Sequence, residues 1–487
     1  MYSSSRIGRF RRAQRRSGGP DVDDDVEDTA ALDLVVIGSG GAAMAAAIAA
    51  RGAGKTVVLV EHATLGGTCV NVGCVPSKTL LAAAGARHGA LGNPFPGAPT
   101  SSGPVDLGAL VEQKDELTGR LRQAKYADVA AAHGFEVRPG HARFADPDTL
   151  LVDDEPLAAH AYLIATGSEP SRPPLPGLDE VDWLSSTTAM EQTELPESLV
   201  VIGGGYVGME QAQLFAHLGA QVTLVGRLAP TAEPELADTL RRVFADDSIT
   251  VIEDRAVQVD VGTGEATVVT GGRQRASGAR LLVATGRTPR TNGLGLDAAG
   301  VQTDERGFVA VDEAQRSSNP RVFAAGDVSG APQYVYVAAA TGRVAALNAT
   351  DAAGPRPAIV DYTGLPAVVF TRPQLASAGL SETQALAAGY RCDCRVLDLA
   401  DVPRALANRD TRGVIKVVAD AESGRMLGVH AAAEAAGEIM LAATYAITAG
   451  MTVDDVADTW APYLTMAEGL RIAAGQFRNQ MPTSCCA

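Results

Sequence analysis

Closely paired cysteines are the residues of this chain with the clearest chemical potential. The 487 residues contain six cysteines, which fall in three pairs: Cys69 and Cys74, Cys392 and Cys394, and Cys485 and Cys486. The first pair lies in the string GGTCVNVGCVPSK (66–78), a glycine-containing loop that runs into a predicted helix. A helix N-terminus lowers the pKa of a thiol, and a thiolate is both a nucleophile and a soft metal ligand. We therefore expect redox or metal chemistry here, rather than a secreted disulfide framework.

The other two pairs differ in what their spacing allows. Adjacent Cα atoms are about 3.8 Å apart, whereas an unstrained disulfide needs about 4.4–6.8 Å. Cys485 and Cys486 are therefore expected to be two free thiols on a terminal tail, suited to capturing a soft metal ion; an incidental exposed pair is the alternative. Cys392 and Cys394 alternate on a predicted strand and so share one face. Ordinary strand packing is favoured there over a second thiol site.

A glycine-rich turn follows the first predicted strand, LDLVVIG. Gly38, Gly40 and Ala43 match the pattern G-x-G-x-x-G/A, and Gly41 lies within it. These small residues allow a tight turn, a close approach of the backbone to a pyrophosphate, and close packing of helix on strand. Glu61 ends the second strand, where a carboxylate can bind ribose hydroxyls. This first βαβ unit is therefore predicted to bind a dinucleotide at its helix N-terminus.

A second βαβ unit begins at Ser198 and carries its own glycines, Gly203, Gly205 and Gly208. Its second strand is followed by Arg227 instead of an acid. An acid would repel a 2′-phosphate, whereas an arginine accommodates it. We predict that this unit binds NADPH in preference to NADH, with a solvated surface role for the arginine as the alternative.

Charge and hydropathy exclude two broad classes of protein. The formal net charge is −16, which disfavours a general nucleic-acid binder because phosphates are attracted by positive surfaces. No uninterrupted apolar run reaches the roughly 18 residues of a membrane-spanning helix. Residues 1–30 carry an arginine-rich block and then an acidic block, and are predicted to be disordered. No apolar segment follows the arginines, so no secretory signal is expected and a cytoplasmic location is predicted.

The elements around these motifs predict an α/β protein with two Rossmann-like, doubly wound domains and an α+β C-terminal domain. Proline-rich connectors at 170–176 and 355–357 mark the expected domain edges. The predicted division is a discontinuous first dinucleotide-binding domain at 31–174 and 291–355, a second at 175–290, and the C-terminal domain at 356–487.

Together these motifs resemble the flavin-dependent pyridine nucleotide–disulfide oxidoreductases, over about residues 31–487. The resemblance implies that the first unit binds FAD, that the second binds the nicotinamide nucleotide, and that 356–487 forms an antiparallel homodimer. It also implies that Cys74 lies against the flavin and that Cys69 is the exchange thiol.

The resemblance implies roles for residues outside the glycine-rich turns as well. Lys78 and Glu210 would form an ion pair near the contact between flavin and nicotinamide, and Tyr206 would cover the nicotinamide pocket. Asp327, in VFAAGD, would hydrogen-bond the ribityl chain of FAD. Further cofactor contacts are implied for small residues in GGTC and in two similar ATG strings: Gly67, Thr68, Thr166, Gly167 and Gly286.

One position departs from the disulfide reductases of this family. Those enzymes carry a histidine five residues before a glutamate as general acid–base, but here Tyr463 precedes Glu468. A phenol with a pKa near 10 is a poor proton shuttle at pH 7. With the tail thiols and the string VPRALANRDTRG (402–413), this departure resembles the mercury(II)-reducing members of the family. Tyr126 and Tyr463 match the two tyrosines that help to hold the ion there; packing residues are the alternative.

The resemblance implies a route for the metal. Cys485 and Cys486 of one subunit would hand Hg(II) to Cys69 and Cys74 of the other, and reduced flavin would deliver two electrons. A mercury-delivering protein is a candidate further partner. Two alternatives stay open. One is a dihydrolipoamide dehydrogenase-like disulfide reductase, against which Tyr463 and Arg227 argue. The other is a thiol protein that sequesters metal, which would not need two nucleotide-binding units.

Overall fold

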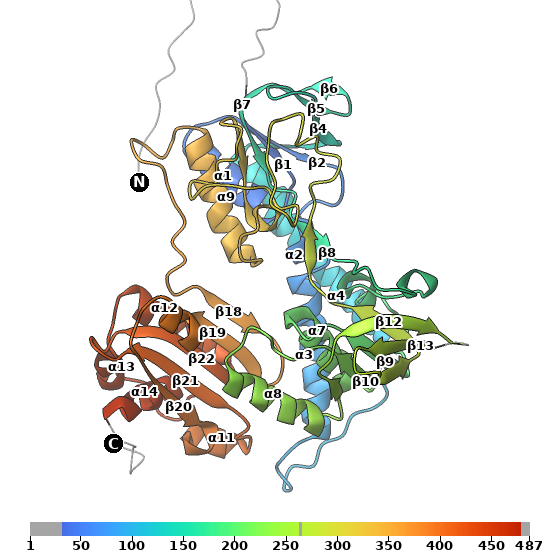
Figure 1. The fold of residues 1–487 in the computed structure, drawn as a ribbon, viewed down its shortest axis with the longest axis vertical. Coiled ribbons are helices and arrows are strands. Elements are labelled where there is room, and N and C mark those ends of the chain that lie inside the picture. The colour runs from blue at the N-terminus through green and yellow to red at the C-terminus, as the bar shows by residue number, and fades with distance from the viewer. Residues whose placement is uncertain (1–31, 263–264, 479–487) are drawn as a thin grey trace, which may run out of the picture. The chain divides into compact units, whose positions relative to one another are not determined.

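The first βαβ unit lies in a five-stranded parallel sheet with the strand order β17-β7-β1-β2-β3 (Figure 1). The computed structural model describes residues 32–262 and 265–478. The strands of this sheet are Leu32–Ile37 (β1), Val57–Glu61 (β2), Glu136–Pro139 (β3), Ala159–Ile164 (β7) and Val322–Ala324 (β17). The central strands are continuous apolar runs because both faces of a parallel sheet are covered.

Helices cover one face of this sheet and a small antiparallel sheet covers the other. On the first face lie α1 (Gly41–Gly52), α5 (Asp128–His133) and α9 (Val335–Ala349). Figure 1 shows α1 beside α9, and a Cβ at Gly342 of α9 would collide with the backbone of Ala42. The second face packs on β4 (Ala142–Phe144) and β5 (Leu150–Val152). These strands pair with each other, and β5 also pairs with β6 (Glu155–Pro156).

The second βαβ unit has the same plan. Its parallel sheet has the order β11-β10-β9-β15 and consists of Thr250–Ile252, Gln221–Val225, Ser198–Ile202 and Arg280–Val283. Helices α7 (Tyr206–Leu218) and α8 (Pro234–Asp246) cover one face. An antiparallel sheet covers the other: β12 (Ala256–Val261), β13 (Ala266–Thr270) and β14 (Arg275–Gly278).

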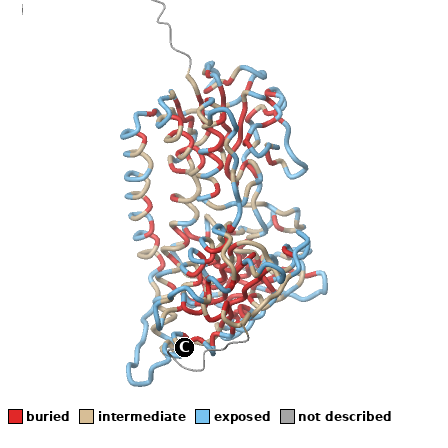
Figure 2. The backbone as a smooth tube through the Cα atoms, turned by 90° about the vertical axis from the view of Figure 1, so that its left-hand side faces the viewer, coloured by how far each residue is buried: buried red, intermediate tan, exposed pale blue. Residues whose placement is uncertain are grey.

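The C-terminal part contains a five-stranded antiparallel sheet in the order β18-β19-β22-β21-β20. Its strands are Pro366–Val369 (β18), Gln374–Gly379 (β19), Cys392–Asp398 (β20), Val414–Asp420 (β21) and Met426–Ala433 (β22). Packed on it are α12 (Ala436–Thr448), α13 (Val453–Asp458) and α14 (Glu468–Gly475). Figure 2 shows buried residues gathered in the interior of the protein and exposed residues along its outer loops.

Four elements that carry or support the predicted thiol chemistry lie between β2 and β3 in the chain. They are α2 (Gly67–Asn71), α3 (Cys74–Leu91), α4 (Leu107–Arg122) and the π-helical turn Gln123–Ala127. Shorter elements are β8 (Ser168–Pro170), α6 (Ser186–Ala189), β16 (Arg287–Pro289), α10 (Glu382–Ala387) and α11 (Pro403–Asn408), with short 3-10 turns at Leu178–Glu180, Gly326–Ser329, Leu399–Asp401 and Gln476–Arg478.

The predicted fold class is confirmed: two parallel sheets with glycine-rich βα turns precede an α+β region. The exact domain edges stay predictions. The predicted disorder of residues 1–30 lies outside the described residues. Among the helices of the described part, none has both the length and the apolar character that a membrane crossing would need.

Candidate functional site

The first cysteine pair lies where two helices meet. Both cysteines were predicted in a loop before a helix, but Cys74 is already the first residue of α3, and Cys69 lies in the short helix α2. The side chain of Asn71 closes that turn by donating to the carbonyl oxygens of Leu65 and Gly67. Since Gly73 offers no side-chain cap to α3, the positive end of this helix is left beside Cys74.

The two thiols have unequal proton affinities. The Cys69 thiol donates a hydrogen bond to Cys74, and this bond, aided by the charge of Lys78, lowers the pKa of Cys74 to about 6 despite partial burial. The same hydrogen bond, together with burial, raises the pKa of Cys69. At pH 7 the pair therefore consists of a thiolate at Cys74 and a thiol at Cys69, which is an arrangement suited to binding a soft cation.

An ion pair lies one helical turn beyond Cys74. Lys78 Nζ is 2.7 Å from Glu210 Oε2 on α7, so the two residues of the predicted pair do meet. The buried Glu210 also accepts a hydrogen bond from the backbone N–H of Phe370 at 2.9 Å. The ring centre of Phe370 is 4.6 Å from Lys78 Nζ. Phe370 was not predicted, because 160 residues separate it from Glu210 along the chain.

The N-terminus of α1 has the shape that a dinucleotide pyrophosphate requires. Gly38 has φ +113°, and a Cβ there would lie 2.5 Å from the carbonyl oxygen of Ala165. Gly40 and Gly67 face each other so closely that a Cβ on Gly67 would be 2.7 Å from the Gly40 Cα. No side chain caps α1, so its first N–H groups are left for an anion. These residues therefore fit the predicted FAD site.

Two carboxylates flank this turn. Glu61, at the end of β2, accepts hydrogen bonds from Ser39 Oγ at 2.6 Å and from the backbone N–H of Ala63 at 2.8 Å. Asp327 accepts a hydrogen bond from Ser168 Oγ at 2.6 Å. Arg287 in turn donates to that hydroxyl, and burial lowers the pKa of this arginine. Ser168 and Arg287 were missed, although they lie beside the predicted positions in the two ATG strings.

The smaller predicted residues of this region form the turns between its strands. Gly67 and Thr68 lie in α2, close to the Gly40 turn and to Gly73 respectively. Thr166 Oγ1 donates to the carbonyl oxygen of Arg290 at 2.7 Å. Both Gly167 and Gly286 have positive φ. Gly41 and Ala43 lie in the first turn of α1, where Ala43 is fully buried.

The second glycine-rich turn is built in the same way. Gly203 has φ +114°, and a Cβ at Gly208 would collide with the Gly203 carbonyl oxygen, so α7 lies hard against β9. A Cβ at Gly205 would meet nothing within 4 Å, and no side chain caps α7. The residues therefore fit a second pyrophosphate.

A cavity of about 520 Å³ opens beside this turn. Its lining comes from the ends of β9 and β10 and from the segment after β11: Ile202, Gly203, Val225, Gly226, Arg227, Glu253, Asp254, Arg255 and Ala256, with Pro173, Pro174, Leu175 and Thr285. Arg227 is exposed at this cavity. Arg255, a second cation in the lining, was not predicted.

Four tyrosines come from three segments: the π-helical turn, α7 and the start of α9. Burial raises the pKa of Tyr126, in the π-helical turn, to about 12, with smaller electrostatic contributions from Cys69 and Cys74. The ring centre of Tyr206 is 6.5 Å from that of Tyr334, which stacks on Tyr336 at 5.3 Å. Burial raises the pKa of Tyr336 to about 12, with smaller contributions from Tyr206 and Cys74. Tyr334 and Tyr336 were not predicted.

The remaining predicted residues lie elsewhere. Tyr463 is exposed, between α13 and α14, and Glu468 is buried at the start of α14. Cys485 and Cys486 lie outside the described residues. Cys392 and Cys394 are on β20, and both pack on the apolar cluster of Ala385, Val418 and Leu427, as expected for one face of a strand.

Comparison with known proteins identifies the family. Residues 32–342 match the model of the pyridine nucleotide-disulphide oxidoreductases, and residues 365–474 match the model of their dimerisation domain. The chain belongs to the pyridine nucleotide-disulphide oxidoreductase family. The resemblance stated from the sequence is therefore confirmed, and the chain carries the dimerisation domain of this family.

Within this family, the chain is similar to mercuric reductases. It is 52% identical over 469 residues to the mercuric reductase of Streptomyces lividans, covering 93% of this chain and 98% of that protein. It is 44% identical over 463 residues to that of Lysinibacillus sphaericus, covering 93% and 84%. Among solved structures, the HOCl-induced flavoprotein disulfide reductase RclA from Escherichia coli superimposes with a TM-score of 0.81 at 28% identity, over 91% of this chain and 99% of that chain.

Proposed function

We propose that this protein is an NADPH- and FAD-dependent oxidoreductase that reduces Hg(II) to Hg(0), and so detoxifies mercury. The observation that carries the proposal is the cysteine pair: the Cys69 thiol donates a hydrogen bond to the Cys74 thiolate, which lies at the start of α3. The similarity to mercuric reductases over 93% of the chain supports the choice of metal.

FAD, when bound, would supply the two-electron redox chemistry that links NADPH to the thiol pair. The residues of the chain position and separate the reactants. The first glycine turn would hold FAD through the N–H groups of α1, and the second would hold NADPH through those of α7. Lys78 and Glu210, 2.7 Å apart, join α3 to α7 between these two turns, and Tyr206 begins α7.

The metal would travel by thiolate exchange. We propose that Cys485 and Cys486 of one subunit pass Hg(II) to Cys69 and Cys74 of the other within an antiparallel homodimer formed through residues 356–487. Each exchange makes one Hg–S bond and breaks another: Cys74 attacks as a thiolate, and the proton of Cys69 passes to the tail thiolate that leaves. The ion then takes up the two electrons that NADPH supplies, both Hg–S bonds break, and Hg(0) and two thiolates remain. Tyr126 and Tyr463 would help to hold the ion.

The choice of nucleotide would depend on the cavity beside β10. Arg227 and Arg255 both line it, and guanidinium groups bind phosphate well. An Arg227→Glu variant should therefore lose its preference for NADPH and turn over NADH comparably well. An unchanged ratio of kcat/KM for the two nucleotides would contradict the proposed role of Arg227 in binding NADPH.

The proposal is tested with the purified, yellow holoenzyme. NADPH oxidation should require Hg(II) with excess low-molecular-weight thiol, and mercury should leave the solution as vapour. Turnover that depends on lipoamide but not on mercury would favour a disulfide reductase. Tight metal binding without turnover would favour a sequestering protein.

The transfer between subunits needs its own test. A double Cys485→Ser/Cys486→Ser variant should lose most of its mercury reduction while NADPH still reduces the flavin at the rate of the parent enzyme. Full activity of this double variant with Hg(II) that is complexed by a bulky thiol would exclude a role for the tail. A cytoplasmic location and a separate mercury-delivering protein stay predictions.

A further inference from the structure

We propose that His88, His217 and Asp247 form a binding site for one divalent cation of the Zn²⁺ class, at the end of α3 that lies away from the redox thiols. The three residues come from α3, from α7 and from the residue that follows α8. Among the described residues they form the one group of three or more His, Cys, Asp or Glu side chains with ligand atoms close enough for a single ion. This site does not depend on mercury reduction.

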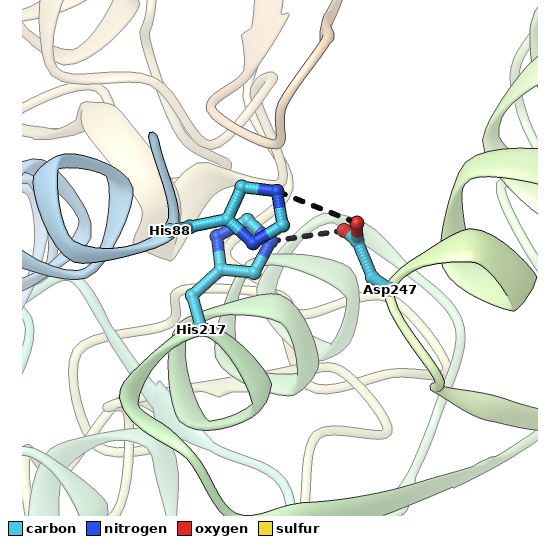
Figure 3. Close-up of side chains that lie close together, drawn as sticks. All are labelled: His88, His217 and Asp247. Carbon is cyan, nitrogen blue, oxygen red and sulfur yellow. Dashed lines mark hydrogen bonds and ion pairs between the residues drawn. The ribbon is translucent and has the colours of Figure 1, made fainter. Parts of the chain in front are cut away.

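The two imidazole rings each direct a nitrogen at the carboxylate of Asp247. His217 Nε2 is 2.9 Å from Asp247 Oδ2, and His88 Nε2 is 3.6 Å from Asp247 Oδ1. The two imidazole rings stack with their centres 3.8 Å apart. Figure 3 shows both rings presenting a nitrogen to the carboxylate. All three ligand atoms lie within 4.8 Å of one another. Zinc binds such atoms at about 2.0–2.2 Å, so the three atoms need to move only slightly towards one another to share an ion.

Burial differs among the three ligands in a way that suits metal entry. The side chains of His217 and Asp247 are 5% and 3% exposed, but that of His88 is 29% exposed. His88 can therefore rotate to complete the site, and solvent on its side can supply a fourth ligand. Two imidazoles and one carboxylate with an open position form a ligand set used for Zn²⁺ and related ions.

A second layer of hydrogen bonds holds the carboxylate in place. Gln213 Nε2 donates to Asp247 Oδ2 at 2.8 Å, and Gln213 Oε1 accepts the backbone N–H of Arg372 at 2.7 Å. Such outer partners orient the ligands of metal sites. The backbone carbonyl of His217 accepts a hydrogen bond from Arg87 at 2.7 Å, which fixes α3 and α7 together at this end.

Two guanidinium groups act electrostatically on this site and oppose a cation. Arg412 and Arg372 both lie near His88. Arg412 pairs with Asp410 at 2.9 Å and with Asp246 at 3.6 Å, so much of its charge is compensated. Arg372 donates to the carbonyl oxygen of Gly85. The buried Asp247 therefore remains the nearest compensating charge for a bound cation.

The site would act as a clamp and not as a catalytic centre. Lys78 and His88 are ten residues apart on α3, which is about 15 Å along a helix. The ion would therefore join the far ends of α3 and α7, while Lys78 and Glu210 join the near ends. We expect a bound ion to stabilise the fold and to leave the thiol chemistry unchanged.

The test uses Zn²⁺ alone as the probe. Chelator-treated holoenzyme has its cysteines blocked with iodoacetamide, since thiolates would bind zinc themselves. Isothermal titration should show one Zn²⁺ per chain in the parent enzyme, and saturating Zn²⁺ should raise Tm by a few degrees. The His88→Asn variant, altered at the exposed ligand, should lose both effects. The control His133→Asn, altered at an exposed histidine at the end of α5, should keep both.

Either of two zinc results would overturn the proposal. One is the absence of zinc binding in the parent enzyme. The other is equal binding by His88→Asn and His133→Asn, which would assign the cluster to hydrogen bonding alone. Co²⁺ provides a second readout on the same blocked enzyme, because a site of two imidazoles and a carboxylate gives d–d absorption without a thiolate charge-transfer band. A cobalt spectrum that His88→Asn leaves unchanged would also reject the site.

Discussion

The two cysteine pairs that the structure describes lie in opposite electrostatic surroundings. Cys74 has the start of α3 and the ammonium group of Lys78 beside it, and its pKa is lowered to about 6. Cys394 lies on an edge strand with Glu382 nearby, and burial and that carboxylate raise its pKa to about 12. From the sequence, thiol chemistry is expected for the first pair and strand packing for the second, and of these residues Cys74 is the one that is a thiolate at pH 7. The neighbours, and not the cysteines, decide which pair can react.

Substitution of one sulfur in each pair should separate them most strongly. We expect Cys74→Ser to reduce Hg(II)-dependent NADPH oxidation by about 100-fold or more, because the thiolate ligand is lost. Cys394→Ser should retain at least half of the parent activity. Steady-state assays on both flavin-loaded variants provide the measurement. A comparable loss in the two variants would show that β20 takes part in the reaction.

Alkylation as a function of pH should resolve the same contrast without mutation. On reduced enzyme, the rate of carboxamidomethylation of Cys74 should be half-maximal near pH 6. Below that pH the rate should fall about tenfold for each pH unit, since protonation removes the thiolate. Cys394, whose pKa is raised, should stay largely unlabelled between pH 5 and 9. Peptide mass spectrometry after timed quenching gives both profiles. Coincident curves would contradict the assigned surroundings.

Much of this fold could be predicted because its signals are local. Continuous apolar strands followed by spaced glycines, such as Gly38 and Gly40, predict a βα turn wherever they occur. The helix α3 was predicted from the run PSKTLLAAAGA, although it begins two residues earlier, at Cys74. The short helix around Cys69 was not predicted, because side-chain hydrogen bonds from Asn71 close it and no periodic pattern in the sequence indicates such bonds.

The unpredicted part of the site depends on contacts between distant segments. Phe370 reaches Glu210 across 160 residues, and Ser168 reaches Asp327 across 159. No local spacing encodes such pairs. The partnership of Lys78 with Glu210 was expected only through the family resemblance, and the functional roles of these residues stay predictions.

Removal of the nearest cation should weaken the contrast between the two pairs by a moderate amount. In Lys78→Met the pKa of Cys74 should rise by about one unit, since an opposite charge close to a thiolate stabilises it. The midpoint of Cys74 alkylation would then move towards pH 7. The same profile for Cys394 serves as an internal control and should not move. An unmoved Cys74 midpoint would assign the shift to Cys69 and the helix terminus alone.

The smallest effect is expected at the acidic neighbour of the second pair. Glu382 is partly exposed and shares the ammonium group of Lys416 with Glu233 and Glu235. Glu382→Gln should accelerate alkylation of Cys394 at pH 9 by only about twofold to threefold, since solvent screens an exposed charge. A change of tenfold or more would mean that this carboxylate dominates the surroundings of Cys394.

The two-ended attachment of α3 to α7 restricts how this protein can be altered. Lys78 meets Glu210 at one end, and Arg87 meets His217 at the other. Inserting one residue between these contacts would turn the far end of α3 by about 100°, so at most one attachment could survive. Length changes are therefore not tolerable between Lys78 and Arg87. A chimera that takes its second nucleotide unit from another enzyme must take α3 along with it.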